Sequence, residues 1–321
     1  MVKTRFDGML FIGFGGPTPG CCRRVDPCPG SEARCFVQGI VGTRPGAEAH
    51  ITGVAAHYEQ LGGFSPYNEL TFRQARTVQQ LLLEQGIAMP VHVGMRHWPP
   101  YVHTALQDMA EQGLQNILAV IMAPHQCFAS WDWYQQTVAA GVEALGDAAP
   151  QVTYLAPWYT HAGYITATVD YLRQACQMFG PARAQQAALI YTAHSIPETM
   201  AANAPYTQQF EATAAAATDL LGHPGYRLAY QSQVIGTPRP WLQPDINDAI
   251  RQAKADGYRD VIVSPIGFLC DHVEVLYDLD VAAQKTAADC GVTLVRAKTV
   301  GNHPAFLTML RDLLLERLQQ G

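Results

Sequence analysis

The chain has 321 residues, which is enough for one large domain or two medium-sized domains with hydrophobic cores. Hydrophobic residues make up 48% of it and charged residues only 15%, and 27 acidic against 21 basic side chains give a net charge of -6. This balance argues against a nucleic-acid-binding protein and against an anchor for anionic membranes, because both need a basic face.

The N-terminal segment Met1–Gly8 carries charged residues but lacks the apolar run and the small-residue cleavage site of a secretory signal. No stretch of the sequence approaches the about 18 apolar residues of a membrane-spanning helix. We therefore expect a cytoplasmic protein without a membrane span. Disulfides are rare in that compartment, so the eight cysteines are expected to be buried thiols or, for some of them, metal ligands.

Runs rich in β-branched and aliphatic residues predict strands at Met9–Phe14, Val91–Met95, Ile117–Ala123, Val152–Ala156, Ala188–Ala193, Leu228–Gln231, Val261–Pro265 and Val292–Ala297. Segments of helical length and period lie between them, including Tyr67–Gln85, which Gly86 closes, and Asp245–Ala255, which Gly257 closes. The last segment, Ala305–Gln320, places four leucines on one helical face.

This alternation of strands and helices predicts an α/β fold with two Rossmann-like domains, each a four-stranded parallel sheet flanked by helices. A seam near Asp147–Pro150 divides the chain. Residues 1–150 with the C-terminal helix 303–321 are expected to form the first half, and residues 151–302 the second. Ligands of parallel sheets bind at the carboxyl ends of the strands, so the candidate functional residues are those that follow a strand.

Gly13-Phe14-Gly15-Gly16-Pro17 follows the first predicted strand. It has Thr18 where a dinucleotide-binding fingerprint needs its third glycine, so the glycines favour a tight turn or the close approach of a flat ligand. In Gly62-Gly63-Phe64-Ser65-Pro66, Ser65 fits a helix N-cap and Pro66 a first helical residue. The paired glycines also fit a backbone that is held open near a ligand.

Arg96, His97 and Trp98 follow the second predicted strand. Arg96 suits a carboxylate, His97 a metal ion or a hydrogen bond, and Trp98 a flat ring. The alternative is that His97 and Trp98 only fill the end of the sheet. Trp131, after the third strand, favours an aromatic wall for a large flat ligand, or inward packing beside a helix start capped by Ser130.

His194 follows the fifth predicted strand and precedes Ser195-Ile196-Pro197-Glu198. Ser195 and Glu198 have the spacing of a capping box, and Pro197 suits a first helical turn. That box does not account for His194, whose position at a strand end favours a catalytic base over a structural histidine.

Three carboxylates follow the seventh predicted strand. A helix that starts at Asp271 would place Asp271, Glu274 and Asp278 on one face. Adjacent carboxylates repel one another unless a cation or a proton relieves them, which favours a metal or proton site. Compensation of the helix dipole and a capping interaction from Glu274 to Asp271 explain two of the three without a ligand.

Half of the cysteines, Cys21, Cys22, Cys28 and Cys35, lie within one loop. Four thiols this close in sequence suit a zinc ion or a [2Fe–2S] cluster, or alternatively a reduced and partly exposed loop. Their spacing matches no established metal-binding pattern.

In their order along the chain, several blocks resemble the ferrochelatases, particularly the short soluble bacterial type that acts on coproporphyrin III. The matching blocks are Gly15-Gly16-Pro17, Gly63-Phe64-Ser65-Pro66, Gly94-Met95-Arg96-His97, Ala193-His194-Ser195-Ile196-Pro197, Tyr230-Gln231-Ser232-Gln233, Trp241-Leu242-Gln243-Pro244, Pro265-Ile266-Gly267-Phe268 and Asp271-His272-Val273-Glu274-Val275. They span most of the chain, and the last ones are the most specific.

The resemblance implies two chelatase-type domains and a lyase of haem and porphyrin biosynthesis, which inserts ferrous iron into a porphyrin and releases two protons. It places His194 and Glu274 in catalysis and metal handling, with His97 and Asp278 as secondary metal positions. An imidazole suits the removal of pyrrole protons, because its pKa is ordinarily near neutrality. The residues expected to contact the porphyrin are Phe14, Ser65, Arg96 and Trp131.

The sequence departs from the family pattern at three points. Phe14 stands where many short members carry a tyrosine that ligates iron, which shifts the expected coordination of iron towards His194. Ala282 stands where an acidic residue often extends the metal path. The loop Cys21–Cys35 lies in the porphyrin-lip segment, whereas cluster ligands in the family lie largely towards the C-terminus, and no cysteine follows Cys290.

Several functions stay open at this point: a coproporphyrin III ferrochelatase that gives coprohaem, a protoporphyrin IX ferrochelatase, a haem or tetrapyrrole carrier without turnover, and a cobalt chelatase of corrin synthesis. The lack of a hydrophobic membrane lip favours coproporphyrin. Its four carboxylates would meet the lip arginines Arg23, Arg24, Arg34 and Arg44. The expected partners are the porphyrin, ferrous iron and downstream haem-pathway enzymes, and a monomer is favoured.

Overall fold

The computed structural model describes residues 5–20, 22, 25, 28–42, 46–234 and 239–319. The chain forms two units, of which the first comprises Met1–Ala123, Phe128–Ala156 and Leu307–Gly321, and the second comprises Pro124–Cys127 and Pro157–Phe306. The expected seam at residues 147–150 precedes a strand, Gln151–Tyr154, that still pairs with the first sheet. The main boundary therefore follows Ala156. Within the described residues, no helix is long and apolar enough to cross a membrane.

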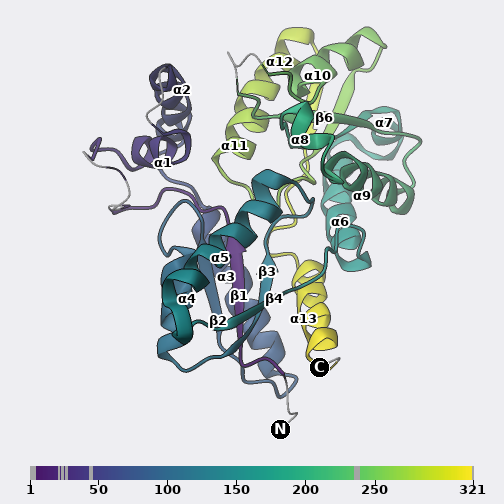
Figure 1. Cartoon of the computed structure of the whole chain (residues 1–321). Coiled ribbons are helices and arrows are strands. Elements are labelled where there is room, and N and C mark those ends of the chain that lie inside the picture. The colour runs from purple at the N-terminus through teal and green to yellow at the C-terminus, as the bar shows by residue number, and fades with distance from the viewer. Residues whose placement is uncertain are drawn as a thin grey trace. The chain divides into compact units, whose positions relative to one another are not determined.

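The first unit contains a parallel sheet with the strand order β2-β1-β3-β4 (Figure 1). Its strands are β1 (Gly8–Gly13), β2 (Val91–Met95), β3 (Asn116–Ile121) and β4 (Gln151–Tyr154). Its helices are α1 (Glu32–Val41), α2 (Ala47–Gln60), α3 (Tyr67–Leu83), α4 (Val102–Glu111), a π-helical turn Phe128–Asp132, α5 (Trp133–Leu145), a 3₁₀ turn Gly146–Ala148 and most of α13 (Pro304–Gln319).

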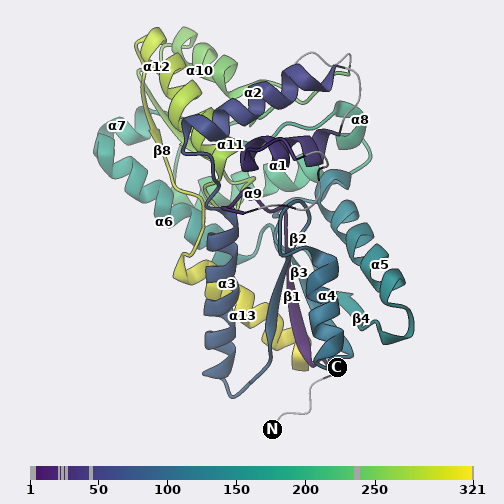
Figure 2. The ribbon, with the colours of Figure 1, turned by 90° about the vertical axis from the view of Figure 1, so that its left-hand side faces the viewer.

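Both faces of the first sheet are covered. Every residue of β1 is buried, as expected for a central strand of a parallel sheet between two helical layers. Leu10 and Ile12 share one face of that strand and pack with Leu106 of α4 and Val138 of α5. Figure 2 shows α4 and α5 on one side of this sheet and α3 and α13 on the other.

The second unit repeats this arrangement, with the strand order β6-β5-β7-β8. Its strands are β5 (Ala188–His194), β6 (Arg227–Gln231), β7 (Asp260–Ser264) and β8 (Thr293–Arg296). Its helices are α6 (Ala162–Phe179), α7 (Pro181–Gln186), α8 (Glu198–Ala201), α9 (Tyr206–Leu221), α10 (Ile246–Ala255), α11 (Val273–Val275), the π-helical segment Leu276–Ala283 and α12 (Gln284–Cys290).

The predicted fold class, two four-stranded parallel sheets flanked by helices, is confirmed. In each sheet the first strand of the unit lies between the second and the third. The connection after the first strand therefore runs towards one edge of the sheet, and the connection after the third strand runs towards the other edge. In the second unit these strands are β5 and β7. A crevice forms where strand order reverses in this way, at the carboxyl ends of the strands, and ligands bind there.

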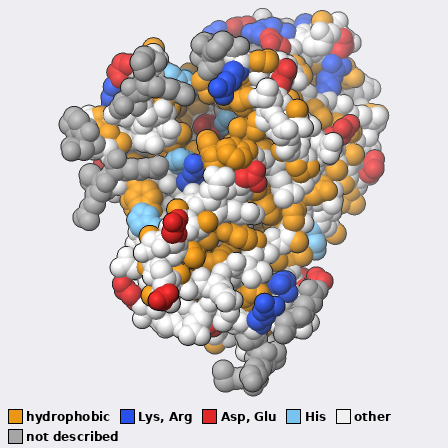
Figure 3. Space-filling view, in the orientation of Figure 1, with side chains coloured by type: hydrophobic (Ala, Val, Ile, Leu, Met, Phe, Trp, Pro, Cys, Tyr) orange, Lys and Arg blue, Asp and Glu red, His pale blue; other side chains and the backbone are white. Residues whose placement is uncertain are grey.

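Charged residues make up only 15% of the chain. On the face shown in Figure 3, Lys and Arg occur singly or in small groups among hydrophobic and neutral side chains. Elsewhere in the described chain, several Arg and Lys side chains form ion pairs within one helix, such as Arg251 with Asp248 at 2.7 Å. Exposed pairs of this kind contribute little to stability, so the fold depends mainly on the two buried cores.

Candidate active site

Polar residues of the second unit meet at the carboxyl edge of its sheet. β5 ends at His194 and β6 ends at Gln231, and the chain after β7 leads to α11, which carries Glu274. Because β5 lies between β6 and β7, these three strand ends are neighbours. The structure thus brings together two predicted site residues, His194 and Glu274, that are distant in sequence.

Main-chain contacts hold His194 in place at the end of β5. Its Nδ1 lies 2.5 Å from the carbonyl oxygen of Ser195, and the hydroxyl of Tyr206 donates to the carbonyl oxygen of His194 at 2.9 Å. A carbonyl oxygen can only accept, so Nδ1 carries the proton. In the neutral ring the lone pair therefore lies on Nε2, which is the nitrogen available as a base.

Glu274 faces that basic nitrogen. His194 Nε2 and Glu274 Oε2 lie 3.7 Å apart, and the two side chains keep 36% and 31% of their surface exposed. The imidazole of His272 caps α11, since its Nδ1 accepts from the main-chain N–H of Glu274 at 3.3 Å. Burial lowers the pKa of His272, which keeps this ring neutral and able to accept.

The capping box predicted for Ser195 and Glu198 is wrong. α8 begins at Glu198 after Pro197, and no side chain caps it. The Ser195 hydroxyl instead donates to the carbonyl oxygen of Leu242 at 2.8 Å. Pro197 forms a β-bridge with Trp241, which brings the residues after β5 next to Leu242. The Ser195 side chain therefore stabilises tertiary structure and does not cap α8.

The three-carboxylate face is also corrected. The helix begins at Val273, not at Asp271, and Asp271 pairs with Arg296 of β8 at 3.1 Å. Arg296 also binds Asp280 at 2.6 Å through Nε. Asp271 is therefore paired with the guanidinium of Arg296. Of the three predicted carboxylates, Glu274 and Asp278 are the two that lie near His194.

Asp278 lies in the π-helical segment Leu276–Ala283 and is held by two side chains at the end of β6. The Ser232 hydroxyl donates to Asp278 Oδ2 at 2.5 Å, and Gln231 Nε2 donates to the same oxygen at 3.4 Å. Burial raises the pKa of Asp278 to about 6, and the Ser232 hydrogen bond opposes that shift. π-Helical turns often occur at functional sites, and this one places a carboxyl that titrates near neutrality beside Glu274.

The raised pKa of Asp278 predicts a pH dependence of stability in the metal-free protein. A carboxyl whose pKa rises from 3.8 to about 6 on folding binds its proton more tightly in the folded chain. It therefore favours folding below pH 4, and that contribution is lost as the pH rises through about 6. Asp278→Asn should gain stability relative to the wild type over this range, by up to about 3 kcal/mol at ~1.4 kcal/mol per unit. Urea unfolding at pH 4 and pH 7 measures the difference, and an equal difference at both values would contradict it.

Gly267 lets the chain after β7 pack directly on β5 beside His194. A Cβ at this position would lie 2.5 Å from the Cβ and 2.6 Å from the Cα of Ala193, and the Gly267 N–H donates to the carbonyl oxygen of Thr192 at 3.0 Å. Ala193 directly precedes His194. A side chain at position 267 that displaces Ala193 should therefore also displace His194.

We expect Gly267→Ala to lower both stability and turnover. The clash with main-chain atoms should cost roughly 1–3 kcal/mol of unfolding free energy, and the displaced His194 should slow catalysis by about tenfold or more. The control is Gly53→Ala in α2, where a Cβ meets nothing within 4 Å; it should leave turnover unchanged. Thermal unfolding and initial rates of both variants test this, and wild-type values for Gly267→Ala would refute it.

The predicted residues of the first unit cluster around the end of β1. The hydroxyl of Tyr67 accepts from the main-chain N–H of Phe14 at 2.9 Å, and the rings of Phe14 and His97 lie 4.5 Å apart. Ser65 packs against Gly16, where a Cβ would lie 2.6 Å from the Ser65 Cβ. The glycine turn and the Gly-Phe-Ser-Pro block thus meet. The N-cap of α3 is Pro66 rather than Ser65, although Ser65 Oγ accepts from the N–H of Tyr67 at 3.3 Å.

The side chains of Arg96 and Trp131, which also belong to the first unit, make different contacts from each other. The Arg96 guanidinium carbon lies 4.0 Å from the ring centroid of Trp133, which is a cation–π contact. Trp131 is 5% exposed, packs in the core of the first unit and donates from its indole N–H to the carbonyl oxygen of Ala123 at 3.1 Å. This is the inward packing that the sequence left open for Trp131, while Ser130 lies inside a π-helical turn and is not its N-cap.

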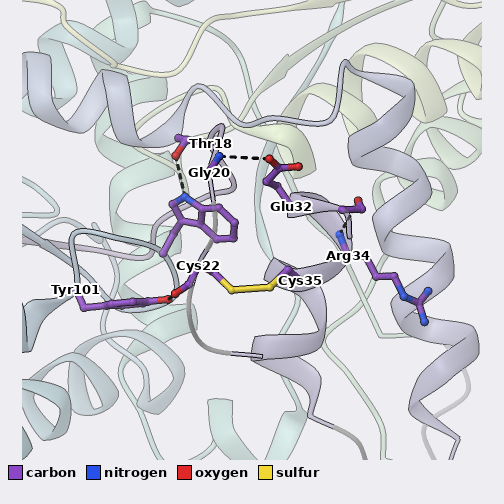
Figure 4. The surroundings of a disulfide bond; sticks show 9 residues. Thr18, Gly20, Cys22, Glu32, Arg34, Cys35 and Tyr101 are labelled. Atoms are coloured by element: carbon purple, nitrogen blue, oxygen red, sulfur yellow. Dashed lines mark hydrogen bonds between the residues drawn. A yellow bond between two sulfur atoms is a disulfide. The ribbon is translucent and has the colours of Figure 1, made fainter. Parts of the chain in front are cut away.

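The cysteine loop differs from the expectation of reduced thiols. Cys22 and Cys35 form a disulfide that joins the segment before α1 to that helix (Figure 4). The Tyr101 hydroxyl also donates to the carbonyl oxygen of Cys22 at 2.9 Å. Cys28 is exposed and free, and Cys21 lies outside the described residues. Cys22 and Cys35 are therefore paired rather than reduced, and a zinc or [2Fe–2S] site at the four cysteines stays a prediction.

Of the four arginines expected to meet porphyrin carboxylates, the structure describes Arg34. Arg34 donates to Glu48 at 2.5 Å and to Thr52 at 3.2 Å, so its guanidinium joins α1 to α2. Arg23, Arg24 and Arg44 lie outside the described residues, and their contact with porphyrin carboxylates stays a prediction.

His194 and Glu274 offer two donors to a cation. Their separation of 3.7 Å is one that two ligands of a first-row divalent ion can span with bonds of about 2.1 Å. Over the described ranges of the chain, no group of three or more His, Cys, Asp and Glu side chains is arranged to hold a metal ion.

Sequence reasoning missed several residues that build this site. Thr192, Ser232 and Arg296 hold its parts together through hydrogen bonds, and Tyr206 anchors the main chain of His194. In the sequence, the block Tyr230-Gln231-Ser232-Gln233 resembles a family motif and so indicates this region. The resemblance gives these residues no role.

Comparison with known proteins gives a consistent result. The Ferrochelatase family model matches residues 34–318. A ferrochelatase of Rhodopirellula baltica is 32% identical over 316 residues, which cover 98% of this chain and 86% of that protein. A coproporphyrin III ferrochelatase of Propionibacterium freudenreichii subsp. freudenreichii is 36% identical over 327 residues, which cover 98% and 88%.

Solved structures agree on the fold. SirB from Bacillus subtilis with Fe3+ superposes with a TM-score of 0.59 at 11% identity, over 97% of this chain and 95% of that chain. CbiX, described as the terminal enzyme for biosynthesis of sirohaem in denitrifying bacteria, superposes with a TM-score of 0.55 at 15% identity, over 97% and 99%. At these identities the likeness shows a shared chelatase fold and nothing of the substrate.

Proposed function

This chain belongs to the ferrochelatase family, lyases that insert a metal into a porphyrin in haem synthesis, and we propose that it inserts Fe2+ into coproporphyrin III to give coprohaem. Three relatives named coproporphyrin III ferrochelatase, at 36%, 32% and 32% identity, support that substrate. The observation that carries the proposed chemistry is the pairing of His194 with Glu274 at the carboxyl edge of the second sheet.

Iron insertion requires a base. The porphyrin loses two N–H protons as Fe2+ takes their place, so the products are the iron porphyrin and two protons. His194 Nε2 accepts a pyrrole proton, because Nδ1 is already committed to the carbonyl oxygen of Ser195. The ring then carries a positive charge, which the carboxylate of Glu274 at 3.7 Å stabilises.

The second carboxyl gives the protons a next acceptor. Asp278 has its pKa raised to about 6, so it takes up and releases a proton near neutral pH. It lies on the π-helical segment that directly follows α11, the helix that carries Glu274. In this proposal His194 removes the protons one after the other, and the two carboxylates pass them towards solvent.

The substrate is tested by anaerobic insertion of Fe2+ into coproporphyrin III and protoporphyrin IX side by side, followed by the absorbance of the metallated product. We expect kcat/KM to be higher for coproporphyrin by about tenfold or more, since one extra hydrogen-bonded charge contributes ~1.5 kcal/mol. A pH indicator should record two protons released per porphyrin. Preference for protoporphyrin would overturn the substrate, and haem binding without turnover would overturn the reaction.

A further inference from the structure

The side chain of Gln231 lies between the strand that carries His194 and the turn that carries Glu274. Its Oε1 accepts from the hydroxyl of Thr192 on β5 at 3.0 Å. Its Nε2 donates to the main-chain carbonyl oxygen of Glu274 at 3.2 Å and to Asp278 Oδ2 at 3.4 Å. One amide thus spans from β5 to α11 and to the π-helical segment.

The main chain of Gln231 makes a further link to β5. The N–H of Ser195 donates to the carbonyl oxygen of Gln231 at 2.7 Å. Thr192 and Ser195 lie on either side of His194, so Gln231 holds the chain before and after the imidazole. Gln231 is 1% exposed and Thr192 is fully buried, so water does not compete for these bonds.

An amide of this length has the chemistry that the position needs. It must accept at one end, where Thr192 donates, and donate at the other, where the carbonyl oxygen of Glu274 can only accept. A glutamate would place an acceptor against that carbonyl and against the carboxyl of Asp278. A methionine would fill the same volume and leave these buried groups without their partner, which is costly in a dry environment.

The next residue completes the arrangement. Ser232 has a φ of 62°, in the left-handed region that residues other than glycine rarely adopt. This conformation places its hydroxyl 2.5 Å from Asp278 Oδ2, the oxygen that also receives Gln231 Nε2. Two consecutive residues at the end of β6 therefore fix the same carboxyl, and backbone strain retained at such a place is typical of functional sites.

We propose that Gln231 is a positioning residue for metal insertion: its buried amide sets the placement of Glu274 and Asp278 relative to His194. The inference rests on the proposed roles of His194 and Glu274. Gln231 does not touch the reactants in this proposal. It acts by binding the main chain of Glu274 and the carboxyl of Asp278, which holds both residues against the strand that carries the base.

The test compares Gln231→Met with Gln209→Met. Gln209 is a matched control, because it is also buried in the second unit and hydrogen-bonded at both ends, to the N–H and the side chain of Gln126. We expect Gln231→Met to lower kcat for iron insertion roughly 10- to 100-fold. The porphyrin Kd, measured by fluorescence quenching, should stay within about twofold. Gln209→Met should lose comparable stability and keep its kcat.

Gln231→Glu supplies a readout that a merely structural role would not give. Its carboxyl has the same shape and regains a donor only when protonated. The ratio of the Gln231→Glu rate to the Gln231→Met rate should therefore rise as the pH falls. Thr192→Val, which removes only the hydroxyl at the other end of the amide, should lower kcat in the same direction by a smaller factor.

Rates are measured with both coproporphyrin III and protoporphyrin IX and expressed relative to the wild type on the same porphyrin. A wild-type preference for protoporphyrin thus overturns the proposed substrate and leaves these ratios intact. The positioning role is overturned if Gln231→Met retains its kcat, if it loses porphyrin binding instead, or if Gln209→Met loses as much activity.

Discussion

Replacing His194 by alanine is expected to lower the rate of iron insertion by roughly 10²- to 10⁴-fold, which is the range that a positioned base contributes. The structure gives the reason: Nδ1 is bound to the carbonyl oxygen of Ser195, so the free lone pair of the neutral ring lies on Nε2, 3.7 Å from Glu274. Alanine removes this base and leaves the surrounding main chain in place, because Tyr206 binds the carbonyl oxygen of residue 194 and not its ring. Porphyrin binding should therefore stay near the wild-type value.

Single-turnover kinetics of iron insertion measure the first effect, and quenching of porphyrin fluorescence measures the second. His223→Ala is the matched control: His223 lies in the same unit, and its Nδ1 also contacts a main-chain carbonyl oxygen, that of Gly225 at 2.6 Å. It lies outside the candidate site and should keep full activity. If His194→Ala inserted iron at the wild-type rate, the assignment of the base would be wrong.

Local patterns in the sequence predicted what is local in the structure. The buried strands are short apolar runs closed by glycine or proline, and all four strands of the second sheet lie where those runs predict them. The position of His194 at a strand end followed from the same pattern. Because the carboxyl ends of parallel strands share one edge, that position was enough to indicate a role in a site.

Long-range pairing explains what the sequence did not predict. The helix expected from Asp271 begins at Val273 because the carboxylate of Asp271 binds Arg296, and nothing near Asp271 in sequence announces that partner. The segment that carries Asp278 is π-helical, so its hydrogen bonds join residues five apart. Faces counted with the spacing of an α-helix do not apply there. Likewise, spacing alone does not reveal that Cys22 and Cys35 are paired.

Arg296→Met is expected to be the most destabilising of the substitutions considered, by roughly 3 kcal/mol. The Arg296 side chain is only 12% exposed and binds Asp280 through two nitrogens, at 2.6 and 2.8 Å, and Asp271 at 3.1 Å. Methionine fills similar volume but leaves two carboxylates close together without a cation. Lysine keeps the charge but cannot reproduce the paired bonds of a guanidinium, so Arg296→Lys should be intermediate.

Urea unfolding distinguishes this cluster from ordinary surface charge. Arg73→Met is the control, since Arg73 and Glu69 form an exposed pair within α3 and their separation should cost less than about 0.5 kcal/mol. Adding Asp271→Asn and Asp280→Asn to Arg296→Met should recover part of the lost stability, because it removes the uncompensated charges. Failure to recover would mean that packing, not charge, makes Arg296 important. Recovery of stability without recovery of iron insertion would show that the cluster also fixes the loop and the π-helical segment on either side of Glu274.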